Sequence, residues 1–245
     1  GLLAHFQGDE AAARAWLTAS LDRSAAGDDP WLRAFALLLL GMVAEDHGDY
    51  AAAEARFVSA LADFRAAGDR ANTAFALTHL GVVAWGLGDV DRAVARCEEA
   101  LALQRGVADD WDVSISLGYL GLLAGERGAH ARAAALHRES LRLRWDAEVW
   151  EEVAASIADM AALAAMTDRV AGAARLFGAA AALREATGRP PVPHEPERGV
   201  YERALARATA ALGEAGYAAA EAAGRALPLE QAVAEATALA DGLAG

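Results

Sequence analysis

Three stretches of this 245-residue chain repeat one another: Leu40-Gly41-Met42-Val43-Ala44, Leu80-Gly81-Val82-Val83-Ala84 and Leu120-Gly121-Leu122-Leu123-Ala124. They recur at a constant stride of 40 residues, and a weaker fourth copy begins at Met160. Three further positions keep this stride. The first position is always alanine, the second is a larger residue in most repeats, and the third is a small residue. They are Ala13, Ala53, Ala93, Ala133 and Ala173; Leu17, Phe57, Cys97, His137 and Phe177; Ser20, Ala60, Ala100, Ser140 and Ala180. Such a stride predicts a solenoid of stacked structural repeats.

Each repeat predicts two helices joined by a turn. In the first helix, Leu37, Leu40 and Ala44 recur at i, i+3 and i+7, which is one helical face. Glycine then ends this helix, because it readily takes the left-handed conformation; the glycines concerned are Gly48, Gly88 and Gly128. Aspartates are expected to cap the helix starts by accepting backbone N–H bonds, and these are Asp9, Asp29, Asp49, Asp69, Asp89 and Asp109. Pro30 is expected at a first helical position, where its missing N–H costs nothing.

The repeated small residues predict where helices approach closely. Gly41, Gly81 and Gly121 should face a neighbouring helix, and the larger residue of the second helix, such as Phe57, should fill the gap between repeat units. Trp31 and Trp111 hold equivalent repeat positions and are expected to pack against the start of each first helix.

The composition excludes several classes of function. All 22 basic residues are arginine, so no lysine is available for a Walker A phosphate loop, a Schiff base or a lysine-dependent kinase. The net charge of −13 argues against direct nucleic-acid binding and against anionic membrane surfaces. A single cysteine, Cys97, allows neither an intrachain disulfide nor a cysteine zinc site and fits a reducing cytoplasm. The longest apolar stretch, residues 34–44, is too short to span a membrane.

No constellation of residues points to catalysis, a cofactor or a metal ion. The nucleophile-elbow, zincin and dinucleotide-binding motifs do not occur. His130 and His137 share a helical face but lie ~10 Å apart along the axis, and a metal needs three or four converging ligands. Adjacent acidic residues such as Glu98 and Glu99 point in different directions on a helix. We therefore expect no enzyme activity, no catalytic residue, no cofactor and no metal site.

The motif Leu40-Gly41, Ala44, Ala53-x3-Phe57, Ala60 resembles the tetratricopeptide repeat. The resemblance covers residues 1–187, although the stride exceeds the usual 34 residues and the extra residues fall between units. Since Gly1 falls at the repeat's own glycine position and is not a methionine, the chain is expected to be a piece of a longer protein that starts inside a unit. The resemblance implies an all-α, right-handed superhelix of helix pairs, with a partial first unit and four 40-residue units.

By that resemblance, the first helices line a concave groove with an exposed ladder of side chains. The groove residues expected to bind a ligand or partner are Leu39, Met42, His79, Val82, Trp85, Tyr119, Leu122, Glu126 and Asp159. The mixture of aromatic, apolar and acidic groups is typical of peptide or small-molecule sites. Two alternatives stay open: the groove surface has no ligand, or the chain's own C-terminal helices fill it.

The composition changes after Glu185. Four of the six prolines fall in residues 188–197, which predicts a loop, and residues 198–245 predict a three-helix segment that caps the solenoid. The helices are expected at about 198–212, 214–225 and 228–241, with Gly213 separating the first two. Stretches on both sides of this change, including Ala174–Ala180 and Gly224–Val233, resemble the segment that closes the repeat region of large LuxR-type and related bacterial regulators. Those regulators carry a STAND-class ATPase module before the repeats and often a helix-turn-helix after them; neither is present here.

These resemblances imply the sensor or protein-interaction module of a cytoplasmic transcriptional regulator. Its groove would bind a protein, a peptide or a small-molecule inducer, and the chain could also self-associate. The alternative is a passive scaffold or dimerisation module that has no small-molecule ligand.

Overall fold

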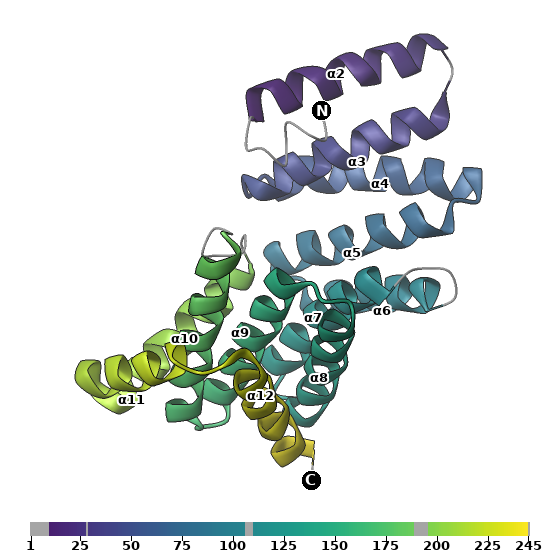
Figure 1. Ribbon diagram of the computed structural model, residues 1–245. Helices are drawn as coiled ribbons and strands as arrows, with labels where there is room; N and C mark the ends of the chain where they lie inside the picture. The colour runs from purple at the N-terminus through teal and green to yellow at the C-terminus, as the bar shows by residue number, and fades with distance from the viewer. Residues whose placement is uncertain (1–9, 28, 106–109, 189–195, 245) are drawn as a thin grey trace. The chain divides into compact units, whose positions relative to one another are not determined.

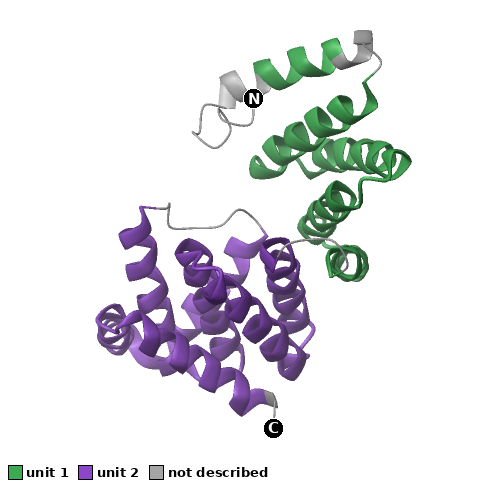
Figure 2. Cartoon of the chain, turned by 45° about the vertical axis from the view of Figure 1, so that its right-hand side comes forward, with its two compact units in different colours: residues 1–108 green, residues 109–245 purple. Residues whose placement is uncertain are grey.

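The computed structural model describes residues 10–27, 29–105, 110–188 and 196–244, and every regular element in these ranges is an α-helix. The chain forms two compact units, residues 1–108 and 109–245 (Figure 2). The helices of the first unit are α2 (Glu10–Gly27), α3 (Pro30–Asp46), α4 (Tyr50–Ala67), α5 (Arg70–Gly86) and α6 (Val90–Gln104). Those of the second unit are α7 (Asp110–Glu126), α8 (His130–Asp146), α9 (Trp150–Met166), α10 (Val170–Thr187), α11 (Glu197–Arg225) and α12 (Leu229–Ala244).

The helix boundaries repeat the 40-residue stride (Figure 1). The first helices of the pairs, here called A helices, are α3, α5, α7 and α9, which begin at residues 30, 70, 110 and 150. The second helices, called B helices, are α4, α6, α8 and α10, which begin at residues 50, 90, 130 and 170. Each A helix packs against the B helix that follows it. The predicted all-α fold of repeated helix pairs is therefore confirmed.

The predicted helix caps are present wherever the structure describes them. The carboxylates of Asp29, Asp49, Asp69 and Asp89 each accept a hydrogen bond from the backbone N–H three residues later, and Pro30 holds the first helical position. The caps expected at Asp9 and Asp109 lie outside the described residues. After the A helices, Gly48, Gly88 and Gly128 have positive φ angles of 72°, 82° and 73°. In the fourth helix pair, Asp168 takes the place of this glycine and has a φ angle of 60°.

The three repeated glycines lie in equivalent surroundings. A Cβ atom built on Gly41 would lie 2.5 Å from the ring of Phe57. Cβ atoms on Gly81 and Gly121 would likewise meet the Cys97 sulfur and the His137 ring. Each glycine faces a neighbouring helix, as predicted, and the contact joins an A helix to the larger residue of its own B helix. That larger residue is buried throughout: Leu17, Phe57, Cys97, His137 and Phe177.

The two equivalent tryptophans are less buried than the sequence suggests. Trp31 and Trp111 stay 45% and 40% exposed, so each is only partly buried at the start of its helix. The indole of Trp31 stacks on Phe35 with ring centroids 5.3 Å apart and donates a hydrogen bond to Asp69. Both residues lie in a first helical turn, where Phe35 covers one face of the Trp31 ring.

The C-terminal part of unit 2 packs around the last repeat. Gly213 has φ 70° and ψ 160°, so α11 consists of two helices that meet at the predicted residue. The predicted loop, residues 188–197, lies largely outside the described residues. Helix α11 packs against α9 and α10, whereas α12 packs against α8, α9 and α10. The described helices include none that is long and apolar enough to cross a membrane.

Candidate functional site

In unit 1, most of the predicted ladder is buried. Leu39, Val82 and Trp85 are 5%, 4% and 6% exposed, which contradicts their expected position on an open groove surface. Leu39 belongs to an apolar cluster with Leu17 of α2. The physical reason is that an A helix has neighbours on several sides: α5 packs against α3, α4 and α6 and buries eleven of its 17 residues. Some of the side chains that the repeat resemblance assigns to a groove are therefore part of the hydrophobic core.

Met42 and His79 are the ladder residues of unit 1 that keep partial exposure. His79 Nδ1 lies 2.8 Å from Glu45 Oε2, and the imidazole lies between the rings of Phe57 and Phe75, at 5.1 and 4.7 Å. Burial alone would lower the pKa of His79. The charge and hydrogen bond of Glu45 outweigh burial and raise that pKa above its ordinary value. The pair is therefore a shielded, titratable contact between α3 and α5.

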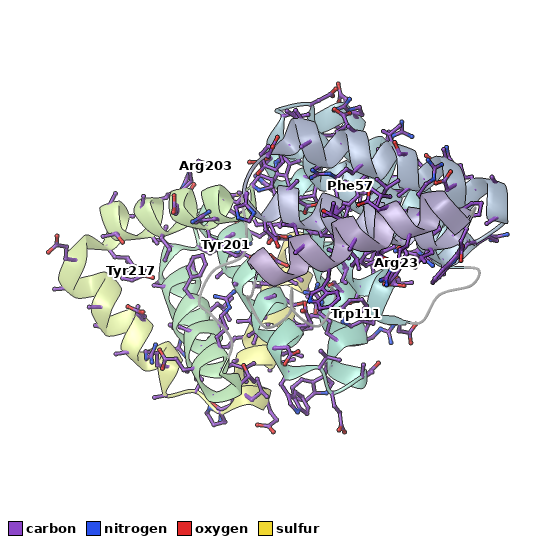
Figure 3. The ribbon with its side chains drawn as sticks, turned by 90° about the horizontal axis from the view of Figure 1, so that it is seen from above. Arg23, Phe57, Trp111, Tyr201, Arg203 and Tyr217 are labelled. Atoms are coloured by element: carbon purple, nitrogen blue, oxygen red, sulfur yellow. The ribbon has the colours of Figure 1, made fainter. Side chains whose placement is uncertain are left out.

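In unit 2, three predicted ladder residues contact the first half of α11. The Tyr201 hydroxyl donates to Asp159 Oδ1 at 2.5 Å, and Arg203 Nη2 donates to Glu126 Oε1 at 2.5 Å. Figure 3 labels Tyr201 and Arg203. The Tyr119 side chain hydrogen-bonds the Glu197 carboxyl. The fourth ladder residue in this unit, Leu122, is buried at 4% exposure. The structure therefore brings together Tyr119, Glu126 and Asp159, and it places the chain's own helix on them.

Asp159 belongs to a larger buried polar cluster that the sequence did not indicate. We define this cluster by Asp159, Arg144, His137, Tyr201 and Glu197, which come from α8, α9 and α11. Asp159, Arg144, His137 and Tyr201 are each less than 8% exposed. The Glu197 carboxyl is buried among them, although the residue as a whole keeps some exposure. Gly118 of α7 lies beside the cluster, since a Cβ there would lie 3.4 Å from the Arg144 guanidinium.

Arg144 is the cation of this cluster. Its Nη1 donates to Ser156 Oγ at 2.8 Å and to the Glu152 carbonyl at 3.2 Å, and its Nε donates to Ser114 Oγ at 3.3 Å. Its Nη2 lies 3.6 Å from the Glu152 carboxylate. Arg144 thus connects α7, α8 and α9 and counters the carboxylates that gather around it.

His137 contacts the cluster without a hydrogen bond at Nδ1. This nitrogen lies 3.7 Å from Asp159 Oδ2, and it has no hydrogen-bond partner in the structure. Burial lowers the pKa of His137 further than the Asp159 charge raises it, so the imidazole is neutral near pH 7. The sequence did contain a signal, because a histidine stands at 137 where other repeats have phenylalanine, cysteine or leucine. Arg144, Tyr201 and Glu197 carried no comparable signal.

The acidic groups of the cluster favour a bound proton. Burial raises the pKa of Glu197 to about 8, and the charge of Asp159 adds to this; the Tyr119 hydrogen bond and Arg144 oppose it. Burial and the neighbouring Asp159 and Glu197 also raise the pKa of Tyr201. Glu197 is therefore mainly protonated at neutral pH, so α11 contacts Asp159 without placing a second full negative charge beside it.

Glu197→Gln is expected to change the pH dependence of stability. Because the folded pKa of about 8 exceeds the ordinary 4.5, the proton on Glu197 stabilises the fold fully below pH 4.5, and this contribution is lost as the pH rises through about 8. Between about pH 5 and pH 9, the wild type should lose on the order of 3 kcal/mol more unfolding free energy than Glu197→Gln. Urea titrations followed by circular dichroism measure this difference. The exposed Glu202→Gln is the matched control, and parallel curves for wild type and Glu197→Gln would contradict the assignment.

The contacts of this site join α11 to the A helices α7 and α9. Within the described ranges, no group of three His, Cys, Asp or Glu side chains is placed to hold a metal ion. In unit 2, Tyr201 and Arg203 of α11 contact the acidic side chains of Asp159 and Glu126. The protonated Glu197 of α11 contacts Tyr119. These features hold one helix against others.

The comparisons with known proteins agree with a helical-repeat protein. Residues 72–144 match the family model described as tetratricopeptide repeat. Among solved structures, the chain is similar to BtubC (BKLC) from P. vanneervenii, with a TM-score of 0.61 and 18% sequence identity. That match covers 94% of this chain and 91% of the other, and at this identity it shows a shared fold. No curated protein matches the sequence.

Proposed function

We propose that this chain is a protein-interaction module that binds helical segments on the A-helix face of unit 2. The tetratricopeptide-repeat region supports an interaction or scaffold role in general. The observation that carries the proposal is the docking of α11 on the A helices of unit 2. Its Tyr201, Arg203 and Glu197 reach Asp159, Glu126 and Tyr119, three of the residues expected to bind a partner. A partner helix of similar chemistry would compete for the same contacts.

The finer form of the proposal places this module in a cytoplasmic transcriptional regulator. There an inducer or partner protein would shift the equilibrium between a closed and an open arrangement, which requires that it bind one of them more tightly. The support is the resemblance of Ala174–Ala180 and Gly224–Val233 to the closing segment of LuxR-type regulators. The sequence of the parent gene tests it: a Walker A motif upstream and a helix-turn-helix downstream are expected.

The alternative, a passive scaffold, is favoured by one specific observation. The predicted ligand contacts Asp159 and Glu126 are already bound to Tyr201 and Arg203 of the same chain. If this contact is permanent, unit 2 is a rigid spacer, and no partner exchanges with α11.

Peptide exchange distinguishes these two functions. In the chain, Tyr201→Ala/Arg203→Ala is expected to loosen α11, whose tethering otherwise gives it a large advantage over any free helix. A labelled peptide of residues 197–212, with the natural sequence, should bind this variant at least about tenfold more tightly than it binds the wild-type chain, as measured by fluorescence anisotropy. Adding Asp159→Asn to the variant should remove the gain.

The control variant is Glu202→Ala, which lies between the two altered residues on an exposed position. It should leave peptide affinity at the wild-type level. Circular dichroism must first show that Tyr201→Ala/Arg203→Ala is folded. If this folded variant binds the peptide no better than the wild-type chain does, the scaffold function is correct and the interaction face is rejected.

A further inference from the structure

A surface cavity lies in unit 1, on the side of its B helices. It encloses about 240 Å³ between α4, α5 and α6. Its apolar lining consists of Val58, Leu61, Ala62 and Leu80, and Val58 is 51% exposed. Charged groups border it: Glu54 and Arg65 from α4, and Arg92 and Arg96 from α6. We call this surface the α4–α6 groove.

The repeat stride identifies the counterpart of this groove in unit 2. Two repeats, or 80 residues, separate α4, α5 and α6 from α8, α9 and α10, which begin at residues 130, 150 and 170. These are the three helices against which α12 packs. In Figure 1, α12 lies alongside α8. A helix therefore covers the surface in unit 2, whereas in the described part of unit 1 the equivalent surface is an open cavity.

The chemistry of α12 shows what kind of helix fits such a surface. Ala232, Ala236 and Ala240 form one face at i, i+4 and i+8 and are 2% or less exposed. Glu235 accepts two hydrogen bonds from Arg175 of α10, at 2.6 and 3.2 Å. Asp241 accepts one from Arg138 of α8, at 2.5 Å. A small-residue face thus lies against the repeat while acidic groups bind arginines of the two B helices.

The α4–α6 groove offers a similar combination from other positions, because the stride places Val58 and Ala95 where α8 and α10 have Arg138 and Arg175. Its arginines also come from the two B helices, and Arg65 and Arg96 share a single carboxylate, Glu99, at 2.5 and 3.3 Å. Arg92 lies 2.8 Å from Glu54. These arginine side chains are 38% to 48% exposed, and exposed ion pairs of this kind contribute little. A partner's carboxylates can therefore replace Glu99 at small cost.

We propose that the α4–α6 groove binds an acidic amphipathic helix of a partner protein, with an alanine-lined apolar face. The groove lies on B helices and is separate from the A-helix face described above. A second copy of this chain is disfavoured as the source, because its α12 would first have to give up Arg138 and Arg175 of its own unit 2. A helix from another protein meets no such cost.

The experiment uses a labelled peptide of residues 228–244 as the probe and the full chain as the receptor. The peptide supplies the required alanine face and acidic groups. The chain's own α12 has a high effective concentration and therefore keeps the surface of α8, α9 and α10 occupied. Binding should saturate in fluorescence anisotropy and weaken as salt is added. Arg65→Glu/Arg96→Glu in the chain should reduce affinity at least about tenfold.

Two controls make the result specific. Arg70→Glu, on an exposed residue of unit 1 outside the groove lining, should change affinity less than about twofold. A peptide with Glu235→Arg and Asp241→Arg should bind the wild-type chain poorly and regain affinity for Arg65→Glu/Arg96→Glu. Equal binding of both peptides, no saturable binding, or no effect of Arg65→Glu/Arg96→Glu would overturn the proposal. A wild-type dimer that Arg65→Glu/Arg96→Glu dissociates in light scattering would assign the groove to a second copy and overturn the partner assignment.

Discussion

Arg144→Met is expected to lower the free energy of unfolding of unit 2 by about 3–5 kcal/mol, because it leaves buried carboxylates without their cation. Arg144 is 6% exposed and donates to Ser114, Ser156 and the Glu152 carbonyl. Methionine fills a similar volume but has no N–H group. The hydrogen-bond acceptors around it would lose their donor, and Asp159 and Glu152 would lose the opposite charge.

The measurement is urea unfolding followed by circular dichroism, combined with hydrogen exchange to locate the weakened helices. Because the chain has two compact units, exchange should rise in α7, α8 and α9 and stay unchanged in α3 to α5. Arg142→Met is a matched control on the same helix: its side chain is 61% exposed and pairs with Asp146 at i, i+4. That variant should differ from wild type by less than about 0.5 kcal/mol. Equal stability of the two variants would show that Arg144 does not neutralise the cluster.

Phe57→Ala should destabilise unit 1 by about 3–5 kcal/mol, the range found when a buried aromatic ring is removed. Phe57 is fully buried, stacks on His79, and fills the space left by the absent side chain of Gly41. Its removal would open a cavity between α3, α4 and α5, since the glycine has no side chain with which to fill it. A rigid helix pair can close such a cavity only partly.

The neighbouring residue provides the control for this second change. Val58 is 51% exposed, and Val58→Ala should alter stability by less than about 0.5 kcal/mol. Denaturant unfolding of both variants, with exchange in α3 to α5 as the local readout, gives the comparison. A Phe57→Ala loss below about 1 kcal/mol would mean that the repeat tolerates an empty position here.

Repeat positions that depend on short-range contacts could be predicted from the sequence. The aspartate caps at Asp49 and Asp89 involve a backbone N–H three residues away, so residue type and spacing suffice to place them. The contact between Gly41 and Phe57 is also within one helix pair, 16 residues apart, and the stride repeats it at Gly81 and Gly121. Even the kink at Gly213 follows from one residue's backbone freedom.

The candidate site was predicted less well, and the reasons are physical. Repeat equivalence treats Leu39, His79, Tyr119 and Asp159 as one ladder, but burial depends on what packs over each helix. Leu39 is covered in an apolar cluster with α2, whereas Asp159 is covered by Tyr201. Tyr201 lies 42 residues from Asp159 and outside the regular repeats, so nothing in the stride indicates the pairing.

The sequence alone therefore determined the helix pairs, their caps, their turns and the buried position shared by Phe57, Cys97 and His137, because these features arise from neighbours within one repeat. Only the tertiary structure decided which repeat surfaces are covered. The docking of α11 on Asp159 and Glu126, and of α12 on Arg138 and Arg175, joins segments far apart in the chain. The burial of Asp159 accompanies the docking of α11, since a carboxylate on a repeat surface stays in solvent until another helix packs over it.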